Sequence, residues 1–409
     1  MNVYDSAMKR LGDVAKIMEL SDNELAILKK PVQIKKTNLI IGKEKLPAWR
    51  IVYNRALGPG KGGIRFHPGV CEDEVKSLAF WMALKNSLAG LPYGGGKGGV
   101  KFNPKGKDDK YLEKVSRAYI DAFYKYLGQD KDIPAPDVYT TPQIMGWMLD
   151  QYEKKVGHHE PAMITGKPIA LGGLNLRSDS TAKGGFIIIN ELLHHTSLKK
   201  ENMKVAIQGF GNAGLNIAKM MENDGFKIVA TSDSRGGIKS KSGSLNIGDL
   251  IDLKKQRKSV VDYTNNCEQI SNAELLELDV DLLVLAALEN QITKENASRI
   301  KAKYILEIAN GPVDEEADRI LHQNKVTVIP DILANAGGVI VSYFEWAQNR
   351  TGGILEEEYL SKKLFDVMEN SWHRVYELYM EKKNIDLRTA AYIIAIERIL
   401  AAERARGNV

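Results

Sequence analysis

The feature that most constrains the fold is a glycine-rich turn directly after a short apolar segment. Residues 204–208 have the composition of a buried strand. They run into six residues that fit the pattern G-x-G-x-x-G, namely Gly209, Phe210, Gly211, Asn212, Ala213 and Gly214. In this pattern the first glycine makes a tight turn, the second lets the backbone approach a pyrophosphate, and the third lets a helix pack against the strand. The segment therefore predicts a dinucleotide-binding strand–turn–helix unit.

The segments around this turn alternate in the same way. Five short apolar runs are typical of buried parallel strands: 205–208, 227–231, 282–285, 304–308 and 326–329. Helices are expected between them, at 212–222, 293–300 and 315–322. Alternation of strands and helices predicts an α/β fold with a Rossmann-type doubly wound sheet.

The end of the second predicted strand bears on the choice of dinucleotide. Asp233 lies 233 − 214 = 19 residues after Gly214, close to the spacing of about 20 expected for an acid that binds the ribose. A carboxylate there favours a free 2′-hydroxyl because it repels a 2′-phosphate. Ser234, Arg235 and Lys239 follow, however, and could bind that phosphate instead. The sequence leaves NAD and NADP open.

Glycine is concentrated in two further places. Nine of the 36 glycines fall in the windows 58–63 and 94–99, which enclose Lys61 and Lys97. Glycine permits positive φ and close approach of a ligand, and Lys85 lies on a helix expected at 72–88 between the windows. Three converging lysines suggest a dianionic substrate, and partial desolvation would lower one lysine pKa towards neutrality. The alternative is that each lysine is a solvated loop charge.

A proline-rich loop is expected at 133–142, after a helix at 111–127. It holds Asp137, whose carboxylate could move protons in a closed apolar cleft, although an aspartate that caps a turn is the more common role.

Other features narrow the class of protein. The net charge is 57 − 52 = +5 with acids interleaved among the bases, which argues against nucleic-acid binding. Cys71 and Cys267 lie far apart and suggest a reduced, cytoplasmic protein. The chain shows neither a signal peptide nor an apolar run long enough for a membrane span. The run at 158–160, His-His-Glu, lacks the spacing of a metal site, so no metal is predicted.

Three regions are expected along the chain. Residues 1–180 would form an α/β substrate-binding and oligomerisation domain, beginning with helices at 4–18 and 21–28 and a strand at 48–57. Residues 181–335 would form the NAD(P)-binding domain, and 336–409 a helical segment that returns towards the first domain.

Several long motifs in a fixed order identify a resemblance. They are GPGKGGIRFHP, LPYGGGKGG, IPAPDVYT, GFGNAG, EIANGP and PDILANAGGVIVSYFEW. From about residue 30 to its end, the chain resembles the glutamate/leucine/phenylalanine/valine dehydrogenase family, and its glutamate-specific members in particular. The resemblance implies reversible, NAD(P)-dependent oxidative deamination of L-glutamate to 2-oxoglutarate and ammonium by a homo-oligomer, usually a hexamer.

The resemblance also implies roles for particular residues. Lys97 matches the catalytic lysine and Asp137 the proton-shuttling aspartate. Lys85 matches the lysine that holds the substrate α-carboxylate, while Lys61 and Ser342 match the pair that holds the side-chain carboxylate of glutamate. Four further residues match positions around the cofactor: Thr181, Asn212, Asn310 and Asn335.

Substrate choice depends on Lys61 and Ser342. Relatives that act on leucine or phenylalanine are expected to lack both, because a buried lysine facing an apolar side chain would be unpaired. Retention of both favours a dicarboxylate. The alternatives are a branched-chain or aromatic amino-acid dehydrogenase, or a catalytically silent NAD(P)-binding subunit. The segments 177–182 and 285–287 depart from the usual family pattern beside the cofactor.

Overall fold

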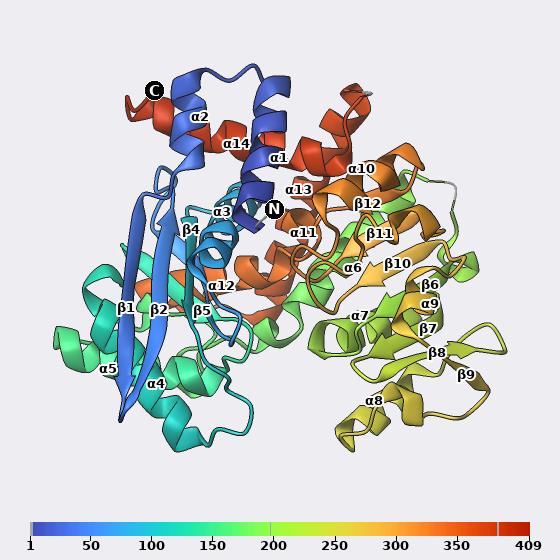
Figure 1. The fold of residues 1–409 in the computed structure, drawn as a ribbon, viewed down its shortest axis with the longest axis horizontal. Coiled ribbons are helices and arrows are strands. Elements are labelled where there is room, and N and C mark those ends of the chain that lie inside the picture. The colour runs from blue at the N-terminus through green and yellow to red at the C-terminus, as the bar shows by residue number, and fades with distance from the viewer. Residues whose placement is uncertain (1–2, 197, 383) are drawn as a thin grey trace. The chain divides into compact units, whose positions relative to one another are not determined.

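The computed structural model describes residues 3–196, 198–382 and 384–409, and the chain forms two compact units (Figure 1). Unit 1 comprises Met1–Ser178, Val339–Lys363 and Tyr392–Val409. Unit 2 comprises Asp179–Gly338 and Leu364–Ala391. Both units have an α/β fold, as the sequence predicts.

The C-terminal helices are shared between the units. Helices α12 (Gly337–Thr351), α13 (Glu357–Glu381) and α14 (Leu387–Ala405) each begin in one unit and end in the other. This differs from the expected return of the whole segment 336–409 to the first domain. The reason is an apolar stripe on α13, where Met368 and Trp372 are buried. Met368 packs against Gly184 of unit 2.

The sheet of unit 1 has five strands in the order β1-β2-β4-β3-β5. Their bounds are Gln33–Ile41 (β1), Glu44–Tyr53 (β2), Gly60–Phe66 (β3), Gly94–Val100 (β4) and Asp132–Pro136 (β5). The pairs β1–β2 and β2–β4 are antiparallel, while β3 runs parallel to both β4 and β5. The two glycine windows are thus neighbouring strands, and the loop expected from residue 133 begins instead as an edge strand.

The windows form strands because these glycines allow close packing. A Cβ on Gly62 would lie 1.7 Å from the carbonyl oxygen of Gly96, and one on Gly95 would lie 2.1 Å from that of Ala79. Neither glycine has φ in the left-handed region. The expectation that these glycines supply positive φ is therefore wrong for both positions. They bring β3, β4 and helix α3 (Glu72–Leu88) into direct contact.

The main core of unit 1 is built from the other face of the sheet. Helices α4 (Asp109–Phe123) and α5 (Pro142–Val156) contribute Tyr119, Phe123 and Met148 to one apolar cluster with Phe66 and Val100 of the sheet. A short 3-10 turn follows α4, where the sequence suggested a continuous helix to 127.

The sheet of unit 2 has seven strands in the order β12-β11-β10-β6-β7-β8-β9. Their bounds are Lys204–Gln208 (β6), Lys227–Asp233 (β7), Gly236–Ser240 (β8), Cys267–Ile270 (β9), Leu282–Leu285 (β10), Tyr304–Glu307 (β11) and Thr327–Ile329 (β12). The strands from β12 to β7 are parallel, as predicted, whereas β8 and β9 add an antiparallel edge that the sequence did not indicate.

One predicted helix of unit 2 is wrong. The segment 293–300 contains a single 3-10 turn, Ala297–Arg299. The side chain of Asn296 accepts a hydrogen bond from the N–H of Thr293 and donates one to the carbonyl of Gln291. Such local side-chain bonds compete with the hydrogen bonds of a helix.

The remaining helices include the two expected at the N-terminus, α1 (Val3–Ile17) and α2 (Asp22–Lys29). The predicted capping box of Ser21 and Glu24 is confirmed. The helices of unit 2 not yet given are α6 (Ser180–His194), α7 (Asn212–Asn223), α8 (Ile247–Lys255), α9 (Asn272–Leu276), α10 (Glu315–Gln323) and α11 (Asp331–Ala334).

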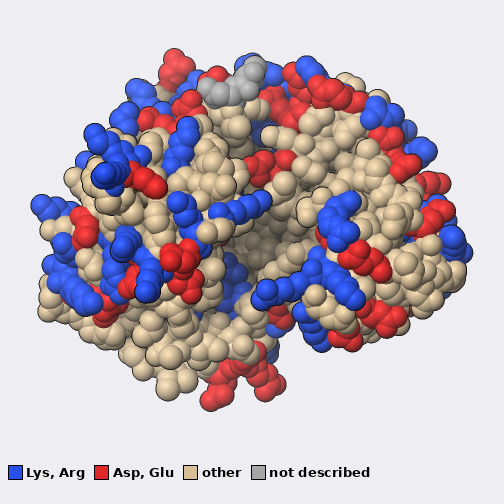
Figure 2. All heavy atoms as spheres, turned by 60° about the horizontal axis from the view of Figure 1, so that its bottom comes forward, with Lys and Arg blue, Asp and Glu red and all other residues tan. Residues whose placement is uncertain are grey.

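Two surface properties complete the description. Lysine, arginine, aspartate and glutamate side chains lie interspersed on the face shown in Figure 2. Within residues 3–196, 198–382 and 384–409, a helix with the length and apolarity needed to cross a bilayer is not found.

Candidate active site

A buried ion pair joins the two residues for which the sequence predicts chemistry. Lys97 lies in β4, and its Nζ is 2.9 Å from Oδ2 of Asp137, which directly follows β5. Their side chains are only 5% and 12% exposed. Arg65 of β3 donates from Nε to the same carboxylate at 3.1 Å, and Nη1 of Arg65 contacts Glu74 of α3 at 2.5 Å. The topology thus brings four charged side chains together in unit 1.

The surroundings shift the acidity of this pair. Burial lowers the pKa of Lys97, and the negative charge of Asp137 offsets this only in part. Burial alone would raise the pKa of Asp137, but the charges of Lys97 and Arg65 overcome it and lower this pKa to about 2. The carboxylate is therefore ionised at neutral pH, and Lys97 releases its proton more readily than an ordinary lysine does.

Lys61 is more deeply buried than Lys97. Its Nζ donates a hydrogen bond to Oγ1 of Thr165 at 2.8 Å and lies 3.5 Å from the carbonyl of Pro134. Burial lowers the pKa of Lys61 well below its ordinary value, although the charge of Glu345 opposes this. The environment supplies few direct contacts to compensate an ammonium, so an added carboxylate would be favourable there.

Strand register places the two window lysines on one face of the sheet. Lys61 lies opposite Gly95 in the β3–β4 ladder, and Lys97 is two residues further along β4. Side chains alternate along a strand, so both lysines share the face of Gly95, which helix α3 covers. Lys85 lies on α3 itself and is also buried. The alternative of solvated loop charges is wrong for all three lysines.

Ser342 belongs to the same unit. It lies on α12 and is buried, one turn before Glu345. The carboxylate of Glu345 contacts Nζ of Lys167 at 2.6 Å and accepts a hydrogen bond from the N–H of Gly166 at 2.9 Å. These contacts fix α12 against the segment that carries Thr165.

A second buried ion pair supports the glycine strands. Arg50 of β2 donates from Nε to Oδ2 of Asp132 at 2.7 Å and from Nη1 to the carbonyl of Gly62 at 3.1 Å. Both charged side chains are fully buried. Sequence reasoning missed Arg50, Arg65 and Asp132, because single charged residues in strand-like segments carry no sign of which partner they will meet.

The glycines at 209–214 have the geometry expected of a pyrophosphate turn. Gly209 has φ +92°, and a Cβ on Gly214 would lie 1.8 Å from the carbonyl oxygen of Gly209. By contrast, a Cβ on Gly211 would have no neighbour within 4 Å. The first and third glycines are therefore required by the fold itself, whereas the second leaves open space where a ligand can approach the backbone.

The start of α7 fits an anionic group. Gly211 is its N-cap residue and provides no side chain to cap the first N–H groups. Asn212 and Gly211 are exposed, Ala213 is half-buried and Phe210 is buried beneath the turn. Uncapped N–H groups and the positive end of the helix dipole favour a phosphate at this position. The residues present thus fit a dinucleotide.

Asp233 uses its carboxylate within the unit. It accepts hydrogen bonds from Oγ of Ser259, Nζ of Lys254 and the N–H groups of Arg235 and Val260, at 2.7 to 3.0 Å. Burial would raise its pKa, but these donors lower the pKa of Asp233 to about 2. Four donors use the acceptor positions of a carboxylate, so a ribose hydroxyl would have to displace one of them. Ser234 beside it is exposed.

Asn335 has an unused acceptor. Its Nδ2 donates to Oδ1 of Asn310 and to the carbonyls of Ile308 and Ala309 at 3.1 to 3.2 Å. Within the described part of the chain its buried Oδ1 has no hydrogen-bond partner. An unpaired buried carbonyl is costly, and the carboxamide of a nicotinamide could supply the missing donor. Thr181 is half-buried in the first turn of α6.

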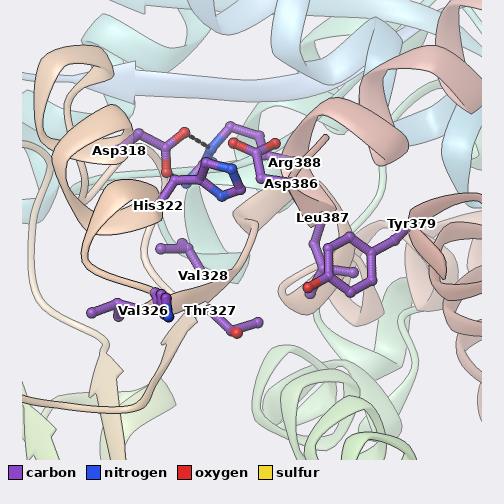
Figure 3. Close-up of a pocket in the computed structure, with 10 residues that line it drawn as sticks. Asp318, His322, Val326, Thr327, Val328, Tyr379, Asp386, Leu387 and Arg388 are labelled. Carbon is purple, nitrogen blue, oxygen red and sulfur yellow. Dashed lines mark hydrogen bonds and ion pairs between the residues drawn. The ribbon is translucent and has the colours of Figure 1, made fainter. Parts of the chain in front are cut away.

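A cavity of about 190 Å³ lies elsewhere in unit 2 (Figure 3). Arg388 at its wall donates to both carboxylate oxygens of Glu307, at 2.7 and 2.9 Å, and to Asp318 at 2.8 Å. Burial raises the pKa of Glu307 to about 7 in spite of that partner. None of the predicted site residues lines this cavity. The guanidinium of Arg388 is already paired with Glu307 and Asp318, so it does not offer a free charge to a ligand.

Two long segments of the chain match one family. Residues 32–154 match the dimerisation domain of Glu/Leu/Phe/Val dehydrogenases, and residues 172–407 match the Glutamate/Leucine/Phenylalanine/Valine dehydrogenase domain. The chain belongs to this family. The resemblance predicted from the glycine windows and the dinucleotide turn is thereby confirmed.

Individual members of the family are similar over almost their whole length. The NADP-specific glutamate dehydrogenase of Synechocystis sp. is 44% identical over 100% of this chain and 98% of its own. The NAD-specific glutamate dehydrogenase of Staphylococcus aureus is also 44% identical, over 99% of this chain and 96% of its own length. The hetero-hexameric glutamate dehydrogenase of Thermus thermophilus superposes with a TM-score of 0.93 at 30% identity, over 99% of this chain and 97% of that one.

Proposed function

We propose that this chain catalyses the reversible oxidative deamination of L-glutamate to 2-oxoglutarate and ammonium with NAD or NADP. The observation that carries the proposal is the buried Lys97–Asp137 pair on the same face of the sheet as buried Lys61. A dicarboxylate needs two cationic contacts and an acid–base group, and the buried lysines Lys61, Lys85 and Lys97 of unit 1 can supply them. The names of the similar proteins support the same activity.

Each lysine has its own task in this proposal. Lys85 holds the α-carboxylate of the substrate, and Lys61 with Ser342 holds the side-chain carboxylate. Lys97 stabilises the oxygen that develops on the former Cα carbon and activates water for attack there. The lowered pKa of Lys97 suits this work because the buried ammonium gives up its proton more readily than an ordinary lysine does.

Asp137 and Lys97 act as a coupled pair. With its pKa held near 2, Asp137 is a poor base while Lys97 carries its charge. It becomes able to accept a proton only as Lys97 gives one up, so the two groups titrate together. Arg65 fixes the orientation of the carboxylate through its 3.1 Å hydrogen bond.

The cofactor site lies in unit 2. The backbone at Gly211 and the start of α7 hold the pyrophosphate, and the unused Oδ1 of Asn335 accepts a hydrogen bond at the nicotinamide end, with Asn310 and Thr181 nearby in the proposed site. A bound nicotinamide supplies the acceptor for the hydride from Cα. Because the donors around Asp233 use its acceptor positions, we propose that it orders the strand end more than it selects between NAD and NADP.

The family match bears on whether the chain assembles. The match to a dimerisation domain indicates an oligomer, and we propose a homohexamer that works in the cytoplasm, where its two free cysteines would stay reduced.

Steady-state kinetics test the proposal. Glutamate turnover is followed by NAD(P)H absorbance with both cofactors, in the wild type and in Lys97→Met and Asp137→Asn. We expect kcat to fall by about 10²–10⁴-fold in each variant, the usual contribution of a positioned acid–base group, with cofactor binding retained.

Two comparisons make this test decisive. Lys114→Met, which removes an exposed lysine of α4, serves as the control and should keep full activity. Wild-type turnover by Lys97→Met would overturn the proposed role, and faster turnover of leucine or phenylalanine than of glutamate would overturn the proposed substrate.

A further inference from the structure

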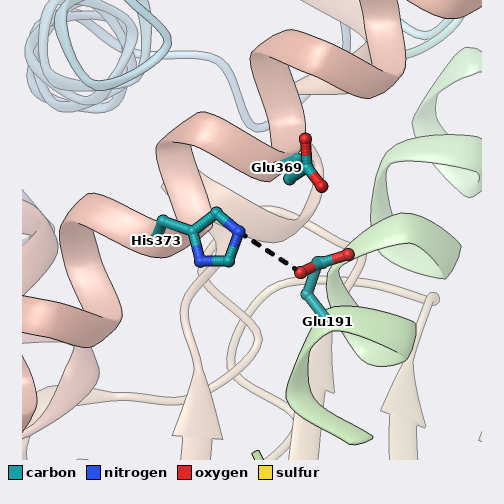
Figure 4. A group of neighbouring side chains, drawn as sticks. All are labelled: Glu191, Glu369 and His373. Atoms are coloured by element: carbon teal, nitrogen blue, oxygen red, sulfur yellow. Dashed lines mark ion pairs between the residues drawn. The ribbon is translucent and has the colours of Figure 1, made fainter. Parts of the chain in front are cut away.

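Three side chains of unit 2 gather in a group that the proposed reaction does not use. Glu191 lies on α6, and Glu369 and His373 lie on α13 (Figure 4). One donor atom from each residue lies within 4.8 Å of the other two. Among the described residues, no other three His, Cys, Asp or Glu side chains have donor atoms that come this close together.

The spacing in the sequence explains why the donors share one direction. Glu369 and His373 are four residues apart on α13, so their side chains emerge from the same face of the helix. Figure 4 shows Glu191 reaching towards His373 from α6. Met368 and Trp372 of α13 are buried beside these positions, and Met368 contacts α6 at Gly184. The helix packing therefore holds the two halves of the group in place.

Among the described residues, a long ion pair to His373 is the contact that meets the charge of the Glu191 carboxylate. Its side chain is only 8% exposed, and its Oε2 lies 3.6 Å from Nε2 of His373, which is beyond hydrogen-bond distance. Burial of an ionised carboxylate is costly unless a cation or strong donors meet it. The arrangement leaves room between the two atoms, and the side chain of His373 is 43% exposed, so an ion can enter from solvent.

We propose that Glu191, Glu369 and His373 bind one divalent zinc ion. Two carboxylate oxygens and one imidazole nitrogen are ligands that zinc accepts in tetrahedral sites, with bonds of about 2.0–2.2 Å and a water in the remaining position. Small side-chain rotations bring donors that now lie within 4.8 Å to that distance. The ring of His195 lies 6.1 Å from that of His373 but is stacked on Tyr376, so it is not counted among the ligands.

The bound ion would connect two helices of unit 2. Helix α6 begins beside Thr181, which the proposed function places near the cofactor, and α13 continues from unit 1 into unit 2. A ligand that binds the folded state alone stabilises it by mass action. Zinc would therefore raise the thermal stability of the protein without taking part in the chemistry at Lys97.

Metal titration of the purified, untagged, full-length protein tests the site. Calorimetry with Zn²⁺ and the visible spectrum with Co²⁺ are measured for the wild type, Glu191→Gln and His373→Gln. We expect one ion per chain, a Co²⁺ spectrum of tetrahedral type, and at least a tenfold loss of affinity in each variant. Absence of stoichiometric binding by the wild type would overturn the proposal.

A matched control tests whether zinc binds at this site or at an exposed pair of a histidine and a carboxylate. Nδ1 of His159 lies 2.7 Å from Glu153 in unit 1, and both are outside the proposed site. The double variant Glu153→Gln/His159→Ala should bind zinc like the wild type. An equal loss in this control, or unchanged binding in His373→Gln, would overturn the assignment.

Folding and activity are checked separately. Circular dichroism and melting curves in the presence of a chelator should be alike for the wild type and His373→Gln, and only the wild type should melt at a higher temperature when Zn²⁺ is added. Glutamate turnover without metal should be unchanged in His373→Gln. A zinc-induced rise in melting temperature that persists in both Glu191→Gln and His373→Gln would also count against the site.

Discussion

Two glycine-rich regions of this protein look alike in sequence and differ in what surrounds them. In the windows of unit 1, a Cβ on Gly62 or Gly95 would meet backbone atoms of the protein at 1.7 and 2.1 Å. In the turn of unit 2, a Cβ on Gly211 would meet nothing within 4 Å. Glycine in the windows is needed for the packing of strands and helix, whereas at Gly211 it leaves space for a ligand.

The difference also separates two kinds of electrostatics. The close packing in unit 1 removes water around Lys61 and Lys97 and lowers both pKa values. The turn in unit 2 instead exposes uncapped N–H groups at the start of α7. One region makes side-chain charges reactive, and the other offers backbone dipoles to an anion. Glycine content alone distinguishes neither use.

The largest expected effect is a loss of stability caused by a substitution that disrupts the packing of the glycine windows. Gly62→Ala should cost at least ~3 kcal/mol of unfolding free energy, or prevent folding, because the new methyl group collides with backbone atoms. Denaturant unfolding measures the change. Gly12→Ala is the control, since Gly12 lies within α1 with nothing within 4 Å of an added Cβ, and alanine is the better helix former there. Equal stability of Gly62→Ala and wild type would contradict the close packing.

The next effect concerns the charge that the windows bury. Lys61→Met should lower kcat/KM for glutamate by about 10–10²-fold, because a hydrogen bond to a charged group contributes about 1.5–3 kcal/mol. Turnover of norvaline, which lacks the side-chain carboxylate, should change far less. Steady-state kinetics of the wild type and Lys61→Met with both substrates give the ratio of the two losses in kcat/KM. Equal losses for both would show that Lys61 does not contact that carboxylate.

A smaller effect is expected in the turn. Gly211→Ala should raise the KM for NAD and NADP by about tenfold, as one unfavourable contact with the pyrophosphate would, while leaving the melting temperature unchanged. Gly214→Ala, whose Cβ would lie 1.8 Å from a backbone oxygen, should instead destabilise the fold. If Gly211→Ala unfolds the protein as readily as Gly214→Ala does, the contrast within the turn is wrong.

The smallest effect is a shift in pH dependence. Deamination should rise with pH as Lys97 loses its proton, at a pH below the ordinary lysine pKa because burial lowers it. The negative charge of Glu74 raises that pKa. Glu74→Gln should therefore move the rise to lower pH by a fraction of a unit. A pH–rate profile of kcat/KM measures the shift, and movement towards higher pH would contradict the stated sign.

Sequence patterns predicted the parts of this molecule whose signals are local. The parallel strands around β6 and the Ser21 capping box follow from periodicity and residue type within a few positions. The predicted helix at 293–300 failed because hydrogen bonds of the Asn296 side chain replace those of the backbone. The antiparallel strands β8 and β9 were not predicted from their short polar segments.

The residues of the candidate site also divide into those that the sequence singled out and those that only the structure revealed. Lys97, Asp137 and Lys61 could be singled out because glycine or proline surrounds them and because their motifs resemble a known family. Their partners Arg65 and Thr165 could not, since each is a common residue whose role depends on what lies across the sheet.

The sequence by itself determined the family, the α/β fold and the residues proposed for chemistry, because these reside in short motifs and repeating patterns. Only the tertiary structure decided that the glycine windows are adjacent buried strands, that Asp137 meets both Lys97 and Arg65, and that Asp233 is already bonded within its own unit. The physical reason is that burial and the pairing of charges depend on residues far apart in the chain, and these set the pKa values on which the chemistry depends.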